Sequence, residues 1–328
     1  MNFKTTVTGS YPRKEVQKDT LRKPSVSDEE AIEMVKWASK EQADLGLDII
    51  TDGESRRLDG YVDSYYAKIQ NIIPLPIGRI GGPWGYDQQQ RYQSVGEITA
   101  PSGLGIVSEF TYLKENTHLQ TKVTCAGPLT FGSRIGPGDV YDGPIAVAEQ
   151  FAEVINIELK DLVKAGADFI QIDEPARGNL GGKDMARLFN LATDGVDAKL
   201  AYHICFGNRY GRARFKRHYS DYFPEILEAK ADQFVVEFAA REMYEVEKFA
   251  EWRDGREIGA GVVDVKSFYP ESTEDVVDRI REVLKHVPAD KLYVNPDCGF
   301  GWSPRYMAIP KLNALVNATA KIRNEIST

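Results

Sequence analysis

The chain has 328 residues, of which 42% are hydrophobic, and its formal net charge is −8 at pH 7. This acidic balance argues against a general binder of nucleic acid or of anionic membrane surfaces. No N-terminal segment resembles a signal peptide, and no apolar run reaches the roughly 18 residues that cross a bilayer, so we expect a soluble, cytoplasmic protein. Three cysteines are too few for a disulfide framework, which makes metal ligation the more informative use of Cys205 and Cys298.

A strand followed by a helix is the unit that recurs along the chain. Short apolar, β-branched runs predict eight strands, at residues 4–8, 48–51, 121–125, 168–172, 199–203, 233–236, 258–263 and 291–294. Amphipathic periodicity and capping residues predict helices at residues 27–45, 58–70 and 144–164, after Ser272, and at 309–322. Residues 72–118 interrupt this rhythm with Pro, Gly and scattered β-formers, and we expect an inserted hairpin or lid there.

Eight strand–helix units predict an α/β fold, a (β/α)8 barrel of the TIM type, as one catalytic domain over residues 1–328. The alternative is a doubly wound open sheet, but no Gly-rich dinucleotide fingerprint follows the first strand. In a barrel the C-terminal ends of the strands meet at one mouth, where active sites lie. Polar residues stand at these ends: Ser10, Asp52, Glu54, Asp173, Glu174, His203, Cys205, Glu237, Asp264, Asp297 and Cys298.

Four of these residues predict a tetrahedral zinc site with one nitrogen, two sulfur and one oxygen ligand: His203, Cys205, Glu237 and Cys298. His203 and Cys205 are two residues apart, so on an extended strand they face the same side. Two thiolates and one carboxylate leave bound Zn²⁺ at a net charge of about −1, which suits a thiol nucleophile better than water. Taken singly, each cysteine is also explained as a small buried hydrophobe, which is our interpretation of Cys125.

Several motifs resemble the catalytic barrel of the cobalamin-independent methionine synthase family. They are TGSYP at 8–12, DGE at 52–54, CAGPLT at 125–130, IQIDEPA at 170–176, YHIC at 202–205, GAGVVD at 259–264 and VNPDCG at 294–299. The resemblance covers nearly the whole chain and implies zinc-dependent methyl transfer to homocysteine. By motif position it implies that the four residues above are the zinc ligands. It further implies that Ser10 holds the homocysteine carboxylate and that Glu54 and Asp173 take its amino group.

The catalytic residues that we expect are Glu237, which the incoming thiol displaces from zinc, Asp173, and Lys266. Lys266 stands where folate-dependent members of the family have a histidine, and Phe131-Gly-Ser-Arg134 lacks the tryptophan that stacks on folate. The chain also matches only the catalytic half of the two-barrel members. These departures favour a methylcorrinoid, or a methylated corrinoid protein as partner, as methyl donor. The alternative is 5-methyltetrahydrofolate.

The same residues are compatible with other functions. A zinc thiol alkyltransferase that opens an epoxide with coenzyme M would have no ammonium for Glu54 and Asp173 to pair with. A zinc-storage protein and a zinc-free decarboxylase on a related barrel are further alternatives. A basic stretch, formed by Arg209, Arg212, Arg214, Lys216, Arg217 and His218, is either a solvated face or a site for an anionic donor or acidic partner. Trp302 and Tyr306 either pack or offer flat apolar surface to the donor.

Overall fold

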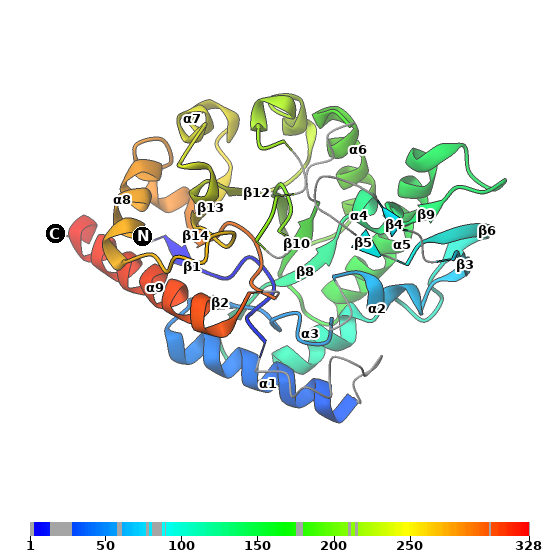
Figure 1. Cartoon of the computed structure of the whole chain (residues 1–328), viewed down its shortest axis with the longest axis horizontal. Coiled ribbons are helices and arrows are strands. Elements are labelled where there is room, and N and C mark those ends of the chain that lie inside the picture. The colour runs from blue at the N-terminus through cyan, green and yellow to red at the C-terminus, as the bar shows by residue number, and fades with distance from the viewer. Residues whose placement is uncertain are drawn as a thin grey trace.

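The structure is a computed structural model of the chain, drawn in Figure 1. It describes residues 3–13, 28–57, 61–76, 79–80, 87–88, 90–174, 180–208, 211–213, 216–301 and 303–327. The N-terminal strand and the C-terminal helix lie at the same side of the molecule, as Figure 1 shows.

Parallel strands form a barrel. Seven of them make one sheet in the order β1-β14-β13-β12-β11-β10-β8. β2 pairs with β7 in parallel, and a bridge from Thr6 to Ile49 connects β2 to the segment that follows β1. Only Lys122 separates β7 from β8, so these two are parts of one barrel strand, and the eight-stranded α/β barrel is confirmed. The bounds are β1 Lys4–Thr5, β2 Ile49–Ile50, β7 Gln120–Thr121, β8 Val123–Ala126, β10 Phe169–Asp173, β11 Lys199–Ile204, β12 Gln233–Glu237, β13 Glu257–Val263 and β14 Leu292–Pro296.

The helices pack around this barrel. Their bounds are α1 Asp28–Leu45, α2 Asp63–Tyr66, α3 Ile106–Glu115, α4 Pro128–Gly132, α5 Gly143–Lys164, α6 Gly182–Thr193, α7 Phe249–Trp252, α8 Thr273–Leu284 and α9 Arg305–Ser327. The predicted capping box of α8 is present, since Ser272 and Asp275 exchange both hydrogen bonds. No described helix has the length and apolar character that a membrane span requires.

Two connections differ from a regular strand–helix alternation. Between β11 and β12 the described residues form only the 3₁₀ turns Tyr219–Asp221 and Glu225–Glu228. Between β12 and β13 they form the 3₁₀ turns Ala239–Arg241 and Val246–Lys248 and the short α7. Of the predicted helix at 58–70, the described residues 61–70 form only the single turn of α2, and β3 begins at Gln70.

Alternation along each strand separates two apolar clusters. Phe169, Ala201 and Val235 share a small cluster with Ile49 and Tyr293. Their strand neighbours, such as Ile170, Ile172, Tyr202, Ile204, Phe234 and Val236, belong to the large cluster. Because successive side chains of a strand point to opposite faces, the small cluster fills the barrel interior and the large one lies under the helices. Further along the interior face come Gln171, Asp173, His203, Cys205 and Glu237.

The segment 72–118 contains both hairpin strands and a helix of the barrel wall. β3 (Gln70–Pro74) pairs antiparallel with β6 (Tyr92–Thr99), and β9 (Ile135–Gly136) extends that sheet. β4 (Arg79–Ile80) pairs with β5 (Asp87–Gln88). In Figure 1 the β3–β6 sheet lies at the edge opposite both termini, whereas α3 packs against α1 and α5. Whether the hairpin acts as a lid remains a prediction.

Candidate functional site

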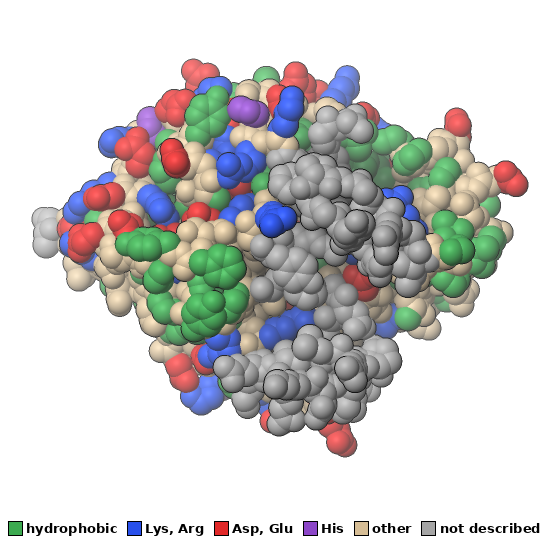
Figure 2. All heavy atoms as spheres, viewed as in Figure 1, with side chains coloured by type: hydrophobic (Ala, Val, Ile, Leu, Met, Phe, Trp, Pro, Cys, Tyr) green, Lys and Arg blue, Asp and Glu red, His purple; other side chains and the backbone are tan. Residues whose placement is uncertain are grey.

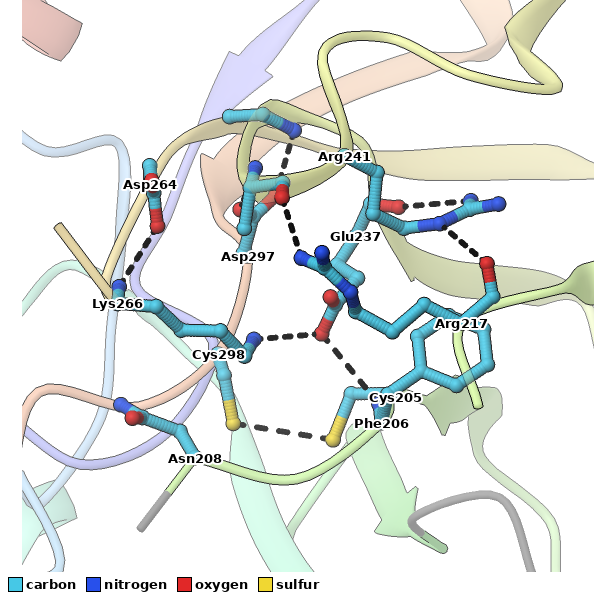
Figure 3. Close-up of polar contacts among 12 residues, drawn as sticks. Cys205, Phe206, Asn208, Arg217, Glu237, Arg241, Asp264, Lys266, Asp297 and Cys298 are labelled. Carbon is cyan, nitrogen blue, oxygen red and sulfur yellow. Dashed lines mark hydrogen bonds and ion pairs between the residues drawn. The ribbon is translucent and has the colours of Figure 1, made fainter. Parts of the chain in front are cut away.

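Three predicted metal ligands lie together at the C-terminal ends of two barrel strands, β11 and β14, which β12 and β13 separate in the sheet. His203 is in β11, Cys205 directly follows that strand, and Cys298 follows β14. One ligand atom from each of the three lies within 4.8 Å of the others. The two sulfur atoms are 3.8 Å apart, and Figure 3 draws them facing each other. Among the described residues, these three side chains are close enough together to share a metal ion. Glu237 does not belong to this group.

The histidine ring is oriented by a backbone contact. His203 Nδ1 lies 3.1 Å from the carbonyl oxygen of Val235, which acts as acceptor. Its Nε2 is buried without a hydrogen-bond partner among the described residues. A metal-binding histidine commonly donates one ring nitrogen to a carbonyl and offers the other to the ion. The nitrogen and two sulfurs therefore form a donor set that fits zinc.

The two thiols of this cluster differ in acidity. Their mutual hydrogen bond is the largest influence on both, with the neighbouring His203 also favouring charge on Cys298. The pKa of Cys298 is lowered well below its usual range, while contact with Cys298 and burial raise the pKa of Cys205 well above it. Cys125 is buried elsewhere, with its thiol donating to the carbonyl of Ala126 at 3.3 Å.

Glu237 lies at the end of β12 beside the cluster but is bound to a lysine. Its Oε2 accepts from Lys266 Nζ at 2.8 Å and from the backbone N–H of Phe206 at 3.3 Å. Its Oε1 is buried without a partner among the described residues. Burial alone would lower the pKa of Lys266, but the carboxylates of Glu237 and Asp297 raise it above its usual value. The sequence-based expectation that Glu237 completes a four-residue ligand set remains a prediction.

Asp297 fixes the turn that follows Glu237. Its carboxylate accepts from the backbone N–H groups of Phe238, Ala239 and Ala240, at 2.9, 3.0 and 2.6 Å. These contacts connect the loop after β14 to the loop after β12. The loop that carries Cys298 therefore also positions the backbone next to Glu237.

A buried acidic pair lies on the other side of His203. Asp173, at the end of β10, is the register partner of His203 on β11. It accepts from Tyr61 Oη at 2.5 Å and from Gln171 Nε2 at 2.6 Å. Glu54 accepts from the hydroxyl of Thr124 at 2.9 Å. Burial raises the pKa of both carboxyl groups, and repulsion by Asp173 and Asp52 adds to the effect at Glu54, whose pKa rises to about 7.

Arg57 partly neutralises this acidic pocket. Its guanidinium contacts Glu54 at 3.1 Å and Glu109 at 3.2 Å, with all three side chains buried. The pocket also contains Asp52, whose Oδ2 is buried without a hydrogen-bond partner among the described residues. Glu54, Glu109 and Asp52 thus share the charge of one arginine, which leaves negative charge for a cationic group of a ligand to balance.

Ser10 connects the N-terminal strand to the loop that holds Cys298. Its Oγ accepts from the N–H of Gly301 at 2.9 Å, and its carbonyl accepts from Phe300. A Cβ on Gly299 would lie 2.1 Å from Ser10 Oγ, so this close approach requires glycine after Cys298. On its other side, a Cβ on the preceding Gly9 would lie 2.6 Å from Glu54 Oε1, so the segment that carries Ser10 passes close to both the Cys298 loop and Glu54.

The basic stretch lies mostly in solvent. Arg212, Lys216, Arg217 and His218 are exposed, and Arg217 donates to the carbonyl of Ala240 at 2.5 Å. Arg209, Arg214 and Trp302 lie outside the described residues. On the face drawn in Figure 2, acidic and basic side chains are interspersed over the described surface. Tyr306 is 75% exposed, so packing, one of the two interpretations of this residue, is wrong.

Comparison with known proteins decides the family. A model of the family described as "Cobalamin-independent synthase, Catalytic domain" matches residues 3–321. The chain belongs to this family. It is 32% identical to a methionine synthase of Saccharolobus islandicus (strain L.S.2.15 / Lassen #1), over 98% of this chain and 95% of that protein. It is 31% identical to a methionine synthase of Sulfolobus acidocaldarius, over 98% and 93%.

Solved structures agree with this assignment to the cobalamin-independent synthases. A B12-independent methionine synthase from Shewanella sp. W3-18-1, in complex with selenomethionine, has a TM-score of 0.84 and 25% identity. The match covers 100% of this chain and 99% of that chain. A second structure, from Listeria monocytogenes, has a TM-score of 0.64 at 22% identity and shows the shared fold.

Membership in a cobalamin-independent family corrects one expectation from the sequence. A methylcorrinoid donor and a corrinoid-protein partner have no support in a family defined by its independence of cobalamin. That expectation was inferred from residues that the chain lacks, such as a tryptophan near Arg134. Arg134 instead pairs with Asp63 of α2. The contacts of Lys266 with Glu237 likewise explain this lysine without reference to the donor.

Sequence reasoning missed three residues of the site. Arg57 and Tyr61 contact the acidic pair directly, and Lys122 lies buried inside the barrel. Arg57 could have been found, because it follows Glu54 by three residues and could reach it within one turn. Tyr61 and Lys122 gave no local signal, since their partners, Asp173 and the carbonyl of Val7, lie more than 100 residues away in the sequence.

Proposed function

We propose that this chain is a zinc-dependent homocysteine S-methyltransferase that forms methionine. The observation that supports it is the register of β10 and β11, in which Asp173 lies beside His203. An ammonium-binding pocket and a sulfur-rich metal site are thereby adjacent. An amino acid with a thiol on a short side chain matches both at once. A thiol without an ammonium, such as coenzyme M, would leave the buried carboxylates unpaired.

Each part of the substrate has a partner in this arrangement. Glu54 and Asp173 would accept hydrogen bonds from the ammonium group, which would also relieve the repulsion between their carboxylates. Ser10 would contact the carboxylate of the substrate from the loop beside Cys298. The thiol would then be directed at His203 and the two cysteines.

His203, Cys205 and Cys298 would hold the zinc ion, and bound zinc supplies a deprotonated, still nucleophilic sulfur at neutral pH. His203, Cys205 and Glu237 are buried and Cys298 is half-buried, which would limit the access of water to the sulfur. The sulfur forms a bond to the methyl carbon, and the bond from that carbon to the donor breaks. We propose 5-methyltetrahydrofolate as the donor, in which case its N5 takes up a proton after the methyl group leaves.

The test is methionine formation from homocysteine by the zinc-loaded protein, with 5-methyltetrahydrofolate in one reaction and methylcobalamin in another. We expect methionine from the folate, loss of activity after chelation, and recovery when zinc is restored. Methionine formed from methylcobalamin but not from the folate would refute 5-methyltetrahydrofolate as the methyl donor. Absence of methionine from both, with zinc bound at one equivalent, would refute the reaction.

A further inference from the structure

Tyr61 lies at the acidic pair, in the turn that leads into α2. Its hydroxyl donates to Asp173 Oδ2 at 2.5 Å, and Gln171 Nε2 donates to the other oxygen, Oδ1, at 2.6 Å. Burial and the nearby carboxylate of Asp173 raise the pKa of Tyr61 well above its usual range, so the phenol keeps its proton and acts as the donor. Each oxygen of Asp173 thus has a side-chain partner that fixes its direction.

Both of these partners are neutral groups. A lysine or arginine in their place would orient Asp173 but would also cancel its charge. A phenol and an amide orient the carboxylate through hydrogen bonds and leave its formal charge for a ligand. Gln171 is itself fixed, because the same Nε2 donates to the carbonyl of Thr8 at 2.6 Å. Asp173 is therefore held in one orientation and can still balance a cation.

The ring of Tyr61 connects the two carboxylates of the acidic pair. The central carbon of the Arg57 guanidinium lies 5.5 Å from the centre of this ring, within the range of a cation–π contact. Arg57 in turn contacts Glu54 at 3.1 Å. Tyr61 therefore contacts Asp173 through its hydroxyl and the cation beside Glu54 through its ring. The tyrosine is half-buried, whereas both carboxylates are buried, so it extends from the pair toward solvent.

We propose that Tyr61 is a positioning residue that determines specificity, because it holds Asp173 in the direction in which this carboxylate accepts the substrate ammonium. This inference rests on the proposed function, since it takes a thiol amino acid as the ligand. The hydroxyl acts through Asp173 and not on the sulfur. Its loss should therefore weaken the binding of a thiol that carries an ammonium group and leave the binding of a thiol without one unchanged.

Binding of two thiols to the zinc-loaded protein tests this, measured by titration calorimetry without a methyl donor. The thiols are homocysteine and 4-mercaptobutanoate, which is homocysteine without its amino group. The wild type should bind homocysteine more tightly, because 4-mercaptobutanoate leaves the buried carboxylates unpaired. Tyr61→Phe keeps the ring and removes the hydrogen-bond donor. We expect it to raise the Kd of homocysteine about tenfold or more, as for a lost hydrogen bond to a charged group, and that of 4-mercaptobutanoate less than about twofold.

Tyr66→Phe is the matched control. Tyr66 lies in α2, close to Tyr61 in the sequence, and its hydroxyl donates to the backbone carbonyl of Phe131 at 2.6 Å. The substitution removes a similarly short hydrogen bond that involves no carboxylate. We expect the Kd values of both thiols to stay within about twofold of the wild type. If Tyr66→Phe weakens homocysteine binding as Tyr61→Phe does, the whole segment is disturbed and the positioning role is overturned.

The outcomes separate the inference from the proposed function. If the wild type binds neither thiol, or binds both equally, there is no site for a thiol amino acid and both fail. If the wild type prefers homocysteine and Tyr61→Phe keeps the full preference, the inference alone fails. Equal weakening of both thiols in Tyr61→Phe would overturn it as well, because Tyr61 would then support the site as a whole and not the recognition of the amino group.

Discussion

Lys122 is expected to make the folded protein less stable at neutral pH. It lies between β7 and β8, is 1% exposed, and its ammonium donates to the neutral carbonyl of Val7 at 2.9 Å. Burial lowers its pKa from 10.5 to about 7, against the raising influence of Asp173. Between these two values the unfolded chain binds a proton that the folded chain does not. Stability therefore falls as the pH falls from about 10.5 to about 7.

The magnitude follows from the difference in pKa. Each pH unit corresponds to about 1.4 kcal/mol, so Lys122 lowers the free energy of unfolding by about 4 kcal/mol at pH 7 and about 2 kcal/mol at pH 9. Lys122→Met keeps the aliphatic chain and removes the titrating group. It also loses the hydrogen bond to Val7, worth about 1 kcal/mol. We expect Lys122→Met to be more stable than the wild type by about 3 kcal/mol at pH 7 and about 1 kcal/mol at pH 9.

Urea denaturation of both proteins at pH 7, 8 and 9 measures this difference. The matched control is Lys311→Met, since Lys311 is equally buried but contacts Glu271 Oε2 at 2.6 Å. Its loss should destabilise the protein by about 2–4 kcal/mol, because a buried carboxylate loses a partner. If Lys122→Met and the wild type differ by the same amount at all three pH values, Lys122 does not titrate in this range and the reasoning is refuted.

Three further predictions concern the site and the barrel wall. The pKa of Glu54 is raised to about 7 and its ionised form binds the ammonium, so the KM for homocysteine should fall as the pH rises from 6 to 8. Glu54→Gln should raise KM about tenfold and remove this pH dependence. If the pH dependence persists in Glu54→Gln, another group causes it. Glu158 accepts from four backbone N–H groups at the start of α3, at 2.6–3.1 Å, so Glu158→Ala should cost about 2–4 kcal/mol in urea denaturation, with Glu158→Gln in between. Cys125→Ser should keep one zinc per chain by elemental analysis whereas Cys298→Ser should lose it; equal zinc content in both would contradict the proposed ligand set.

Local sequence patterns were sufficient for the barrel and for part of the site. His203 and Cys205 face the barrel interior because alternate residues of a strand share a face, which needs no tertiary information. The same argument places Asp173 at an interior position of β10. Helix ends were less well predicted: α9 begins at Arg305, before the expected start at 309, and contains Pro310, whose missing N–H costs the helix one backbone hydrogen bond without ending it.

Contacts between side chains of distant segments could not be predicted from the sequence. Lys266 was expected to replace a catalytic histidine, but the structure pairs it with Glu237, 29 residues away on the neighbouring strand. Tyr61 reaches Asp173 across 112 residues. Such partners depend on how far each strand is shifted against the next, and that register is set by packing of the whole barrel.

The sequence by itself determined the fold class, the family and which side chains point into the barrel, because strand periodicity and motif order are properties of neighbouring residues. Only the tertiary structure decided which of those side chains meet. In it, Asp173 lies beside His203, Arg57 forms a salt bridge with Glu54, and Lys266 forms one with Glu237. The physical reason is that a buried charged side chain must pair with a group at the same level along the barrel axis. The register between strands sets which residues share that level.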